Sequence, residues 1–315
     1  MTAPTHHEDP GTRPAARASA RASPGGAVTR IAVGVDDYPE GRDAVALGTA
    51  IARVTGAELM LVAVQPDPLV VLPPGMDSKS LHEQAEKTLR EVRDSLAPDA
   101  RIVVERDLSI ARALHRVVRR EHRDLLVLGS SRHARDGRVR AGKRTRQLLC
   151  NFECALAVAP RGRHARPGIR FRRIGVGYDG GPESDAALAL AGSIAVAAEA
   201  ELHVRAVVDD RVPVLLRSAL GGLVSAEWRD AVQDEQNRLE EQARAAARLT
   251  SAAAQIEILC GRPDEALLAL SEEVDLLVIG SRRWGPAARV LLGSSGEALL
   301  RDGACAIMAV PRPAA

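Results

Sequence analysis

The second half of the chain contains a loop whose residue types suit the binding of an anion. The apolar run Leu276–Ile279 ends at Gly280, and Arg282 and Arg283 follow in a loop of glycine, serine, arginine and proline. Thirteen residues after Gly280, the stretch Gly293-Ser294-Ser295 opens an Ala/Leu-rich helical pattern. A strand, a loop of small residues and the start of a helix together present backbone N–H groups and a positive dipole end. This order of residues therefore predicts an anion-binding loop.

A second copy of this arrangement lies 151 residues upstream, where Gly129 and Arg132 are followed by Gly142 and Lys143. The stretch Arg132–Arg146, called here the basic stretch, holds seven arginine or lysine residues and a single acid. A helix start that carries Lys143 suits a phosphate or a nucleotide, and a solvated surface loop is the alternative interpretation. We do not expect nucleic acid as a partner, because no aromatic residues are interleaved with these charges.

Other chemistries find no support in the sequence. The chain has neither a Gly-x-Ser-x-Gly nucleophile elbow nor a P-loop lysine motif, and its histidines form no metal-binding motif. We therefore predict no enzymatic activity and no metal. The four cysteines make no CxxC pair, and Cys154 and Cys305 fall in apolar runs that predict buried thiols. Nothing in this pattern argues for oxidising surroundings, so we predict a cytoplasmic protein.

The composition is that of a globular protein with about two domains. The chain has 315 residues, of which 46% are hydrophobic and 27% charged, which gives enough apolar material for two cores. Aromatic residues make up only 2%, so valine, leucine, isoleucine and alanine must fill the cores. No apolar run approaches the roughly 18 residues that a membrane helix needs, so we expect no membrane partner.

An internal repeat fixes the domain organisation. Arg30–Asp36 matches Arg173–Asp179 at an offset of 143 residues, and Asp124–Ser130 matches Asp275–Ser281 at an offset of 151. One unit therefore occurs twice, and the second copy is longer in its middle. The predicted parts are a disordered tail over 1–28, a first domain over 29–160, a linker over 161–170 and a second domain over 171–313.

Each unit alternates short apolar runs with helical patterns in the order β-α-β-α-β-α-β-α-β. The apolar runs are continuous, which is typical of strands buried on both faces of a parallel sheet. The alternation predicts two tandem doubly wound α/β domains, each with a five-stranded parallel sheet. The expected strands lie near 30–35, 58–65, 101–105, 124–129 and 154–159, and near 173–178, 201–208, 255–259, 275–280 and 305–310.

The usual strand order of such sheets predicts where a ligand binds. Ligands lie beyond the carboxyl ends of the strands at the point where the strand order reverses, between the first and fourth strands. Asp36 and Asp179 end the two first strands, and Gly129 and Gly280 end the two fourth strands. The position of Asp179 is equally natural for the N-cap of a helix that begins at Pro182.

These residues resemble the universal stress protein family, here as a tandem of two such domains. The resemblance rests on Val-Gly-x-Asp with Pro-Glu after the first strand, on Gly-Ser-Arg after the fourth, and on a closing Val-Pro. It implies the adenine-nucleotide α-hydrolase-like, Rossmann-like fold and ATP as ligand. It also implies that Asp179 meets the ribose or phosphates and that the Val207 backbone meets adenine. The further nucleotide-binding candidates are Gly280, Arg282, Arg283, Gly293, Ser294 and Ser295, with Asp36, Val64, Gly129, Arg132, Gly142 and Lys143 in the first copy.

The sequence departs from the family loop Gly-x2-Gly-x9-Gly-Ser/Thr at its second glycine, which is Arg132 in one copy and Arg283 in the other. An arginine can fork onto phosphate oxygens, and it can equally block the backbone approach that glycine permits. We expect a non-catalytic stress-response module that binds ATP or a related nucleotide, mainly in the second domain. The alternative is a protein-interaction scaffold that binds no nucleotide. An enzyme of the adenine-nucleotide α-hydrolase-like superfamily is a third interpretation, which no catalytic group supports.

The last strand of each unit predicts a contact between the two units. The apolar runs 155–159 and 306–310 close their sheets, and an exposed apolar edge strand tends to pair with another strand. Two such edges in one chain predict an internal pseudo-dimer, which the family resemblance also implies. A homodimer is a further possible assembly.

Overall fold

The computed structural model describes residues 27–65, 78–149, 154–165, 168–210, 226–284 and 289–311. The first half of the chain alternates strands and helices as its sequence pattern predicts. Its strands are β1 (Arg30–Val35), β2 (Glu58–Gln65), β3 (Arg101–Arg106), β4 (Leu125–Gly129) and β5 (Ala155–Ala159). Its helices are α1 (Pro39–Thr55), α2 (Ser78–Leu96), α3 (Ile110–Arg120) and α4 (Lys143–Leu149).

The second half repeats this order, which confirms the predicted doubly wound α/β class. Its strands are β6 (Arg173–Tyr178), β7 (Glu201–Val208), β8 (Ala254–Cys260), β9 (Leu276–Gly280) and β12 (Ala306–Val310). Its helices are α5 (Pro182–Ala198), α7 (Ala226–Arg248), α8 (Pro263–Glu273) and α9 (Ser294–Asp302). A short antiparallel hairpin, β10 (Arg282–Trp284) with β11 (Arg289–Leu291), lies between β9 and α9 and is absent from the predicted pattern.

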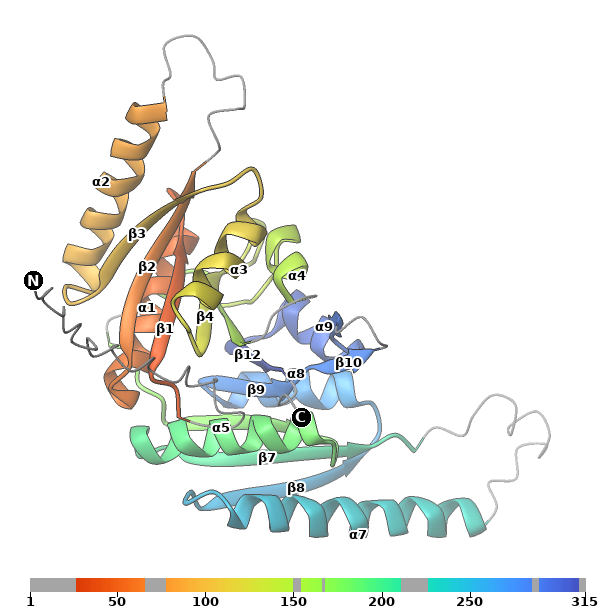
Figure 1. Cartoon of the computed structure of the whole chain (residues 1–315). Helices are drawn as coiled ribbons and strands as arrows, with labels where there is room; N and C mark the ends of the chain where they lie inside the picture. Colours follow the sequence, from red (N-terminus) through yellow and green to blue (C-terminus); the bar gives the residue numbers. More distant parts are fainter. Residues whose placement is uncertain are drawn as a thin grey trace, which may run out of the picture.

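The strands are continuous apolar runs because helices cover both faces of the sheet. In β1, Ile31, Ala32 and Val33 are all fully buried. Ile31 and Val33 belong to a core cluster that includes α1 and α5 residues, whereas Ala32 belongs to a second cluster with residues of α3, α8 and α9. Helices α1, α2, α5 and α7 therefore cover one face, and α3, α4, α8 and α9 cover the other (Figure 1).

The two halves form one ten-stranded sheet with the strand order β3-β2-β1-β4-β5-β12-β9-β6-β7-β8. All neighbours are parallel within each half, and β5 pairs with β12 antiparallel. In this central pair Ala157 lies opposite Met308, and Val158 lies opposite Ile307. Figure 1 shows the first half, in red to green, meeting the second half, in green to blue, along this line.

The junctions of the predicted domains are tied to the sheet where they are described. The tail prediction covers residues 1–28, of which 1–26 lie outside the described residues, and Val28 is buried in the core. In the linker, the backbone N–H groups of Gly162 and His164 donate to the carboxylate of Asp43 at 2.9 Å and 2.7 Å. The Asp43 side chain lies on α1 and is buried. It therefore fixes the path of the linker against the first half.

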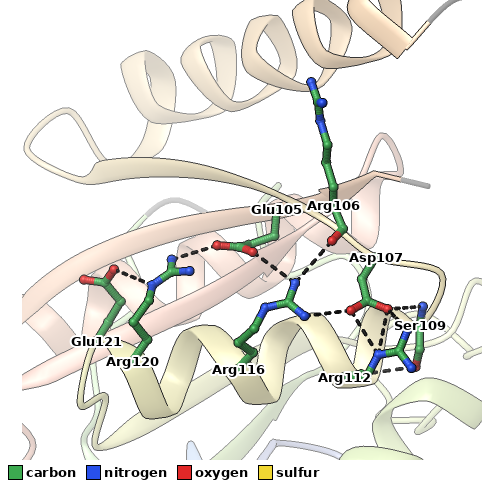
Figure 2. A network of polar contacts seen from close by, with 8 residues as sticks. All are labelled: Glu105, Arg106, Asp107, Ser109, Arg112, Arg116, Arg120 and Glu121. Carbon is green, nitrogen blue, oxygen red and sulfur yellow. Dashed lines mark hydrogen bonds and ion pairs between the residues drawn. The ribbon is translucent and has the colours of Figure 1, made fainter. Parts of the chain in front are cut away.

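Helix α3 is tied to strand β3 by a ladder of charges (Figure 2). Arg116 bridges Asp107 and Glu105, at 2.8 Å and 3.2 Å, and Arg120 reaches Glu105 at 2.7 Å. Arg112 contacts Asp107 at 2.5 Å. The arginines recur every four residues along α3, a rise of about 6 Å. Glu105 and Asp107 are two residues apart in extended chain, which spans roughly 6.6 Å, so the two rows of charges stay in step.

Two further predictions concern membranes and thiols. Along the described ranges, no helix combines the length and apolarity that a membrane crossing requires. Cys154 and Cys305 are buried, as predicted, and burial raises the pKa of the Cys305 thiol well above its ordinary range.

Candidate functional site

The first half of the sheet carries a cavity of about 420 Å³ at the carboxyl ends of β1, β2 and β4. It lies at the point where the strand order reverses, since β1 pairs with β2 on one side and with β4 on the other. The cavity brings together all the candidate residues that the sequence assigned to the first copy. They are Asp36, Val64, Gly129, Arg132, Gly142 and Lys143.

Gly129 is required by the fold itself. A Cβ at this position would overlap the backbone carbonyl oxygen of Glu40, because β4 ends against the start of α1. The equivalent Gly280 is in the same position, where a Cβ would lie 2.6 Å from the carbonyl carbon of Glu183. The glycine at each strand end is therefore explained by close packing on α1 or α5, whatever the site binds.

Gly142 has no comparable role in packing. A Cβ added there would meet only the Cβ of Ser131, at 3.9 Å, which is an ordinary contact. The Gly142 carbonyl accepts a hydrogen bond from the backbone N–H of Arg146 at 3.1 Å, and any residue type could make that bond. Gly142 directly precedes α4, where glycine is common as an N-cap, and it also lines the cavity, where a glycine permits the close approach of a ligand.

The serines that follow Gly129 and Gly280 hold the loops to the sheet. The buried Ser130 hydroxyl donates to the carbonyl of Ala159 at 2.7 Å and accepts from the backbone N–H of Arg140 at 3.2 Å. In the second half, the buried Ser281 hydroxyl donates to the Val310 carbonyl at 2.9 Å. Each Gly-Ser pair therefore anchors its loop to the last strand of its own half.

Asp36 and Asp179 lie where the sequence predicts them, at the carboxyl ends of β1 and β6. Each carboxylate is exposed and closes the turn before the next helix. Asp36 accepts from the backbone N–H of Tyr38 at 3.2 Å, and Asp179 accepts from that of Gly181 at 3.0 Å. The N-cap residues are Tyr38 and Gly181 themselves, so the N-cap interpretation of Asp179 is wrong. Both carboxylates order the loop beside the sheet edge.

The cavity carries positive charge from the chain on one side. The guanidinium carbon of Arg132 lies 5.9 Å from the centroid of the Tyr38 ring, within cation–π range. Lys143 is exposed at the start of α4. Among the described residues, neither Arg132 nor Lys143 is paired with a carboxylate. Glu40, a buried acid in the lining, faces Arg161 at 3.6 Å.

The basic stretch holds the two halves together, a role that the sequence interpretation missed. Arg135 binds the carboxylate of Asp302 at 2.7 Å, and Arg138 binds Glu272 at 2.5 Å. Arg146 of α4 forms an ion pair with Glu297 of α9.

Backbone hydrogen bonds also join the basic stretch to the second half. The N–H of Val139 donates to the carbonyl of Gly303, and the N–H of Ala141 donates to that of Leu300, both at 2.7 Å. These bonds satisfy carbonyl groups at the end of α9. A signal for the contact was present in the sequence, because Arg146 and Glu297 are separated by the repeat offset of 151 residues and carry opposite charges.

The second-half candidates lie at the carboxyl ends of β6, β7 and β9, which are at the opposite edge of the ten-stranded sheet because β12 pairs with β5 antiparallel. Val207 is half-buried near the end of β7, and Ser294 is exposed at the start of α9. The Gly293 carbonyl accepts from the N–H of Glu297 at 3.0 Å, as Gly142 does for Arg146. The backbones of Arg282 and Arg283 belong to the β10–β11 hairpin, but their side chains and residues 285–288 lie outside the described residues.

Metal chemistry has no visible basis in the part of the chain that the structure describes. No three side chains of His, Cys, Asp or Glu gather there in a way that could hold an ion. The described site is a cavity with apolar and polar side chains in its lining, including cations and the ordered carboxylate of Asp36.

Comparison with known proteins places this geometry in context. The model of the universal stress protein family matches residues 27–160 and 170–311. A universal stress protein from Archaeoglobus fulgidus DSM 4304 is similar in structure, with a TM-score of 0.66 and 18% identity over 90% of this chain and 98% of that chain. A protein of unknown function from Pseudomonas aeruginosa PAO1 has a TM-score of 0.58 and 18% identity, over 90% of this chain and 93% of its own. At these identities the likeness shows the fold.

Proposed function

The chain belongs to the universal stress protein family, with two family domains in tandem, and we propose that it is a non-catalytic stress-response module that binds ATP or a related adenine nucleotide. The observation that carries this proposal is the cavity of about 420 Å³ at the strand reversal of the first half. Its size and place suit a small-molecule ligand.

The lining of this cavity combines residue types that suit a nucleotide. The lining has apolar side chains that suit a base, and it has the cations Arg132 and Lys143 with Gly142, which suit phosphates. Asp36, at the end of β1, places a carboxylate in the lining, and carboxylate oxygens accept hydrogen bonds from ribose hydroxyl groups. The apolar residues of the lining are Val62, Val64, Ile110, Leu114, Leu128 and Leu148.

The second half remains the other candidate domain. The sequence favours it, because Gly293-Ser294 keeps the family's phosphate-binding residues while the first half has Gly142-Lys143. The described geometry supports the first half, because the cavity lies there. We therefore propose a nucleotide site in the first domain, and the stronger binding expected of the second domain stays a prediction.

Calorimetric titration of the purified full chain with ATP, AMP and cyclic nucleotides tests this function. We expect heat of binding for at least one adenine nucleotide. Gly142→Val should remove the part of that heat that comes from the first domain, because the added side chain fills the cavity beside Lys143. The matched variant Gly293→Val changes the equivalent position of the second half and reports on that domain separately. Binding that survives in the double variant Gly142→Val/Gly293→Val would place the site elsewhere, and the absence of heat with every nucleotide would remove the proposal.

The scaffold alternative has one observation in its favour. Arg132, which replaces a family glycine, lies with its guanidinium over the Tyr38 ring in the lining. A cation of the chain itself then occupies the region that phosphates would enter. The titration separates the two functions, because a scaffold gives no heat with any nucleotide.

We also propose that the β5–β12 pair serves as a dimer contact made within one chain. The two strands satisfy each other's backbone groups, so neither leaves an open edge at the centre of the sheet. Light scattering on the full chain should therefore give the 33.5 kDa of a single copy. Twice that mass would show that a second surface forms a homodimer.

A further inference from the structure

A second cavity, of about 270 Å³, lies on the line where the two halves meet. We call it the seam cavity. Residues of the basic stretch line one side, and the last turn of α9 lines the other. Its charged and titratable residues are His133, Arg135, Arg138, Arg140, Arg301 and Asp302.

The acids around the seam cavity are already neutralised by the chain. Both carboxylate oxygens of Asp302 accept from Nη2 of Arg135 at 2.7 Å. Arg138 binds the carboxylate of Glu272 at 2.5 Å and donates to the backbone carbonyl of Asp302 at 3.3 Å. Two of the four guanidinium groups are therefore used in holding the halves together.

The other two guanidinium groups have no such use. Arg140 donates from Nη1 to the backbone carbonyl of His133 at 3.4 Å, a weak contact with a neutral acceptor. Arg301 is exposed in the last turn of α9. Within the described ranges, neither side chain is paired with a carboxylate. The seam cavity thus has a surplus of positive charge contributed by both halves of the chain.

The repeated fold does not require these two arginines. At the repeat offset of 151 residues, Arg301 corresponds to Cys150 and Arg140 corresponds to Leu291. In the sequence, the corresponding residues of the other copy are therefore uncharged. The repeat therefore does not require arginine at these two positions, whereas Arg138 recurs as Arg289.

We propose that the seam cavity binds the phosphate chain of an oligophosphate, held between Arg140 of the first half and Arg301 of the second. Guanidinium groups fork onto phosphate oxygens, and His133 at the rim adds a further hydrogen-bond donor. A chain of several phosphates carries more oxygens and more negative charge than a single small oxyanion, so it can engage both guanidinium groups at once. The seam cavity and the nucleotide cavity share His133, but Arg140 and Arg301 line the seam cavity and not the nucleotide cavity, so the proposal does not depend on nucleotide binding.

Titration of the full chain with sodium tripolyphosphate at low ionic strength tests the site. We expect the double variant Arg140→Gln/Arg301→Gln to bind at least about tenfold more weakly than wild type, because two charge-assisted hydrogen-bonding groups are lost. The matched control is Arg53→Gln/Arg248→Gln, which removes two exposed arginines from the last turns of α1 and α7. The control should bind within about twofold of wild type.

Further arms separate this site from the nucleotide cavity. Gly142→Val should leave the tripolyphosphate binding that depends on Arg140 and Arg301 unchanged, and the seam double variant should leave any ATP binding to the first-domain cavity unchanged. Equal losses in the seam and control variants would show only general attraction to a basic protein and would overturn the proposal. Absence of binding in wild type, or binding lost only in Gly142→Val, would overturn it as well.

Discussion

Gly129 and Gly142 belong to the same glycine motif, but they have different physical roles in this protein. Gly129 packs against the Glu40 carbonyl, whereas Gly142 has open space on the cavity side. We therefore expect Gly129→Ala to destabilise the fold by about 1–3 kcal/mol, the cost of overpacking a close backbone contact. Gly142→Ala should stay within about 0.5 kcal/mol of wild type. Urea denaturation of both variants measures the difference.

The second half offers an internal control for this prediction. Gly280→Ala should resemble Gly129→Ala, because its Cβ would meet the backbone of Glu183 in the same way. Equal stability of Gly129→Ala and Gly142→Ala would show that β4 can shift away from α1 at little cost.

At the scale of elements, the α3–β3 ladder couples an edge strand to its covering helix (Figure 2). Hydrogen bonds from Arg112, then from the Ser109 N–H and Arg116, hold the pKa of the nearly buried Asp107 well below its ordinary value. The same contacts raise the pKa of Arg112 and Arg116, which stay charged. The carboxylate therefore contributes to stability in its charged form.

Asp107→Asn should lower the free energy of unfolding at neutral pH. The folded-state pKa of Asp107 lies below the unfolded-state value, so its contribution is present above about pH 4 and is lost as the pH falls below that. The deficit of the variant should accordingly shrink in acid. Urea unfolding at several pH values between about 7 and 3 measures it.

Asp94→Asn is the matched control, since Asp94 contacts Arg93 at 2.8 Å but is largely exposed. Exposed pairs contribute little to stability. A deficit of the Asp107 variant that stays constant down to acid pH would show that its cause is lost packing.

The sequence predicts most elements because their signals are local. Each strand is a continuous apolar run, and α1 and α5 each have proline at their first turn. The β10–β11 hairpin was not predicted, because strands of three residues are too short to show an apolar pattern in the sequence. The first-copy candidates were found together because the carboxyl ends of parallel strands share one edge. The contacts of Arg135 and Arg138 could not be predicted, since they join residues far apart in the chain.

At the scale of the whole molecule, Arg146 and Glu297 occupy equivalent positions in the two repeats and contact each other. Reversing one charge, in Arg146→Glu or Glu297→Arg, should lower the free energy of unfolding by up to about 1 kcal/mol, since both side chains are partly exposed. The double reversal should recover most of that loss. A double-mutant cycle in urea measures the coupling.

The Arg244–Glu240 pair of α7 gives the matched control, because it lies within one helix. Reversing the charges of Arg244 and Glu240 should not change whether the two halves unfold in a single urea transition. No recovery in the double reversal of Arg146 and Glu297 would mean that the Val139 and Ala141 backbone bonds hold the halves without help from this ion pair.

The antiparallel β5–β12 join has a consequence for how this protein can diverge. In a pair of identical subunits, each substitution appears twice, so a residue facing its own copy always meets its like. A single chain removes that constraint, and selection can act on one pocket while the other is left unchanged. Arginine can then face glutamate across the pseudo-twofold axis, and Lys143 can stand where the other copy has Ser294. The fused architecture lets two related pockets acquire different ligands within a single gene product.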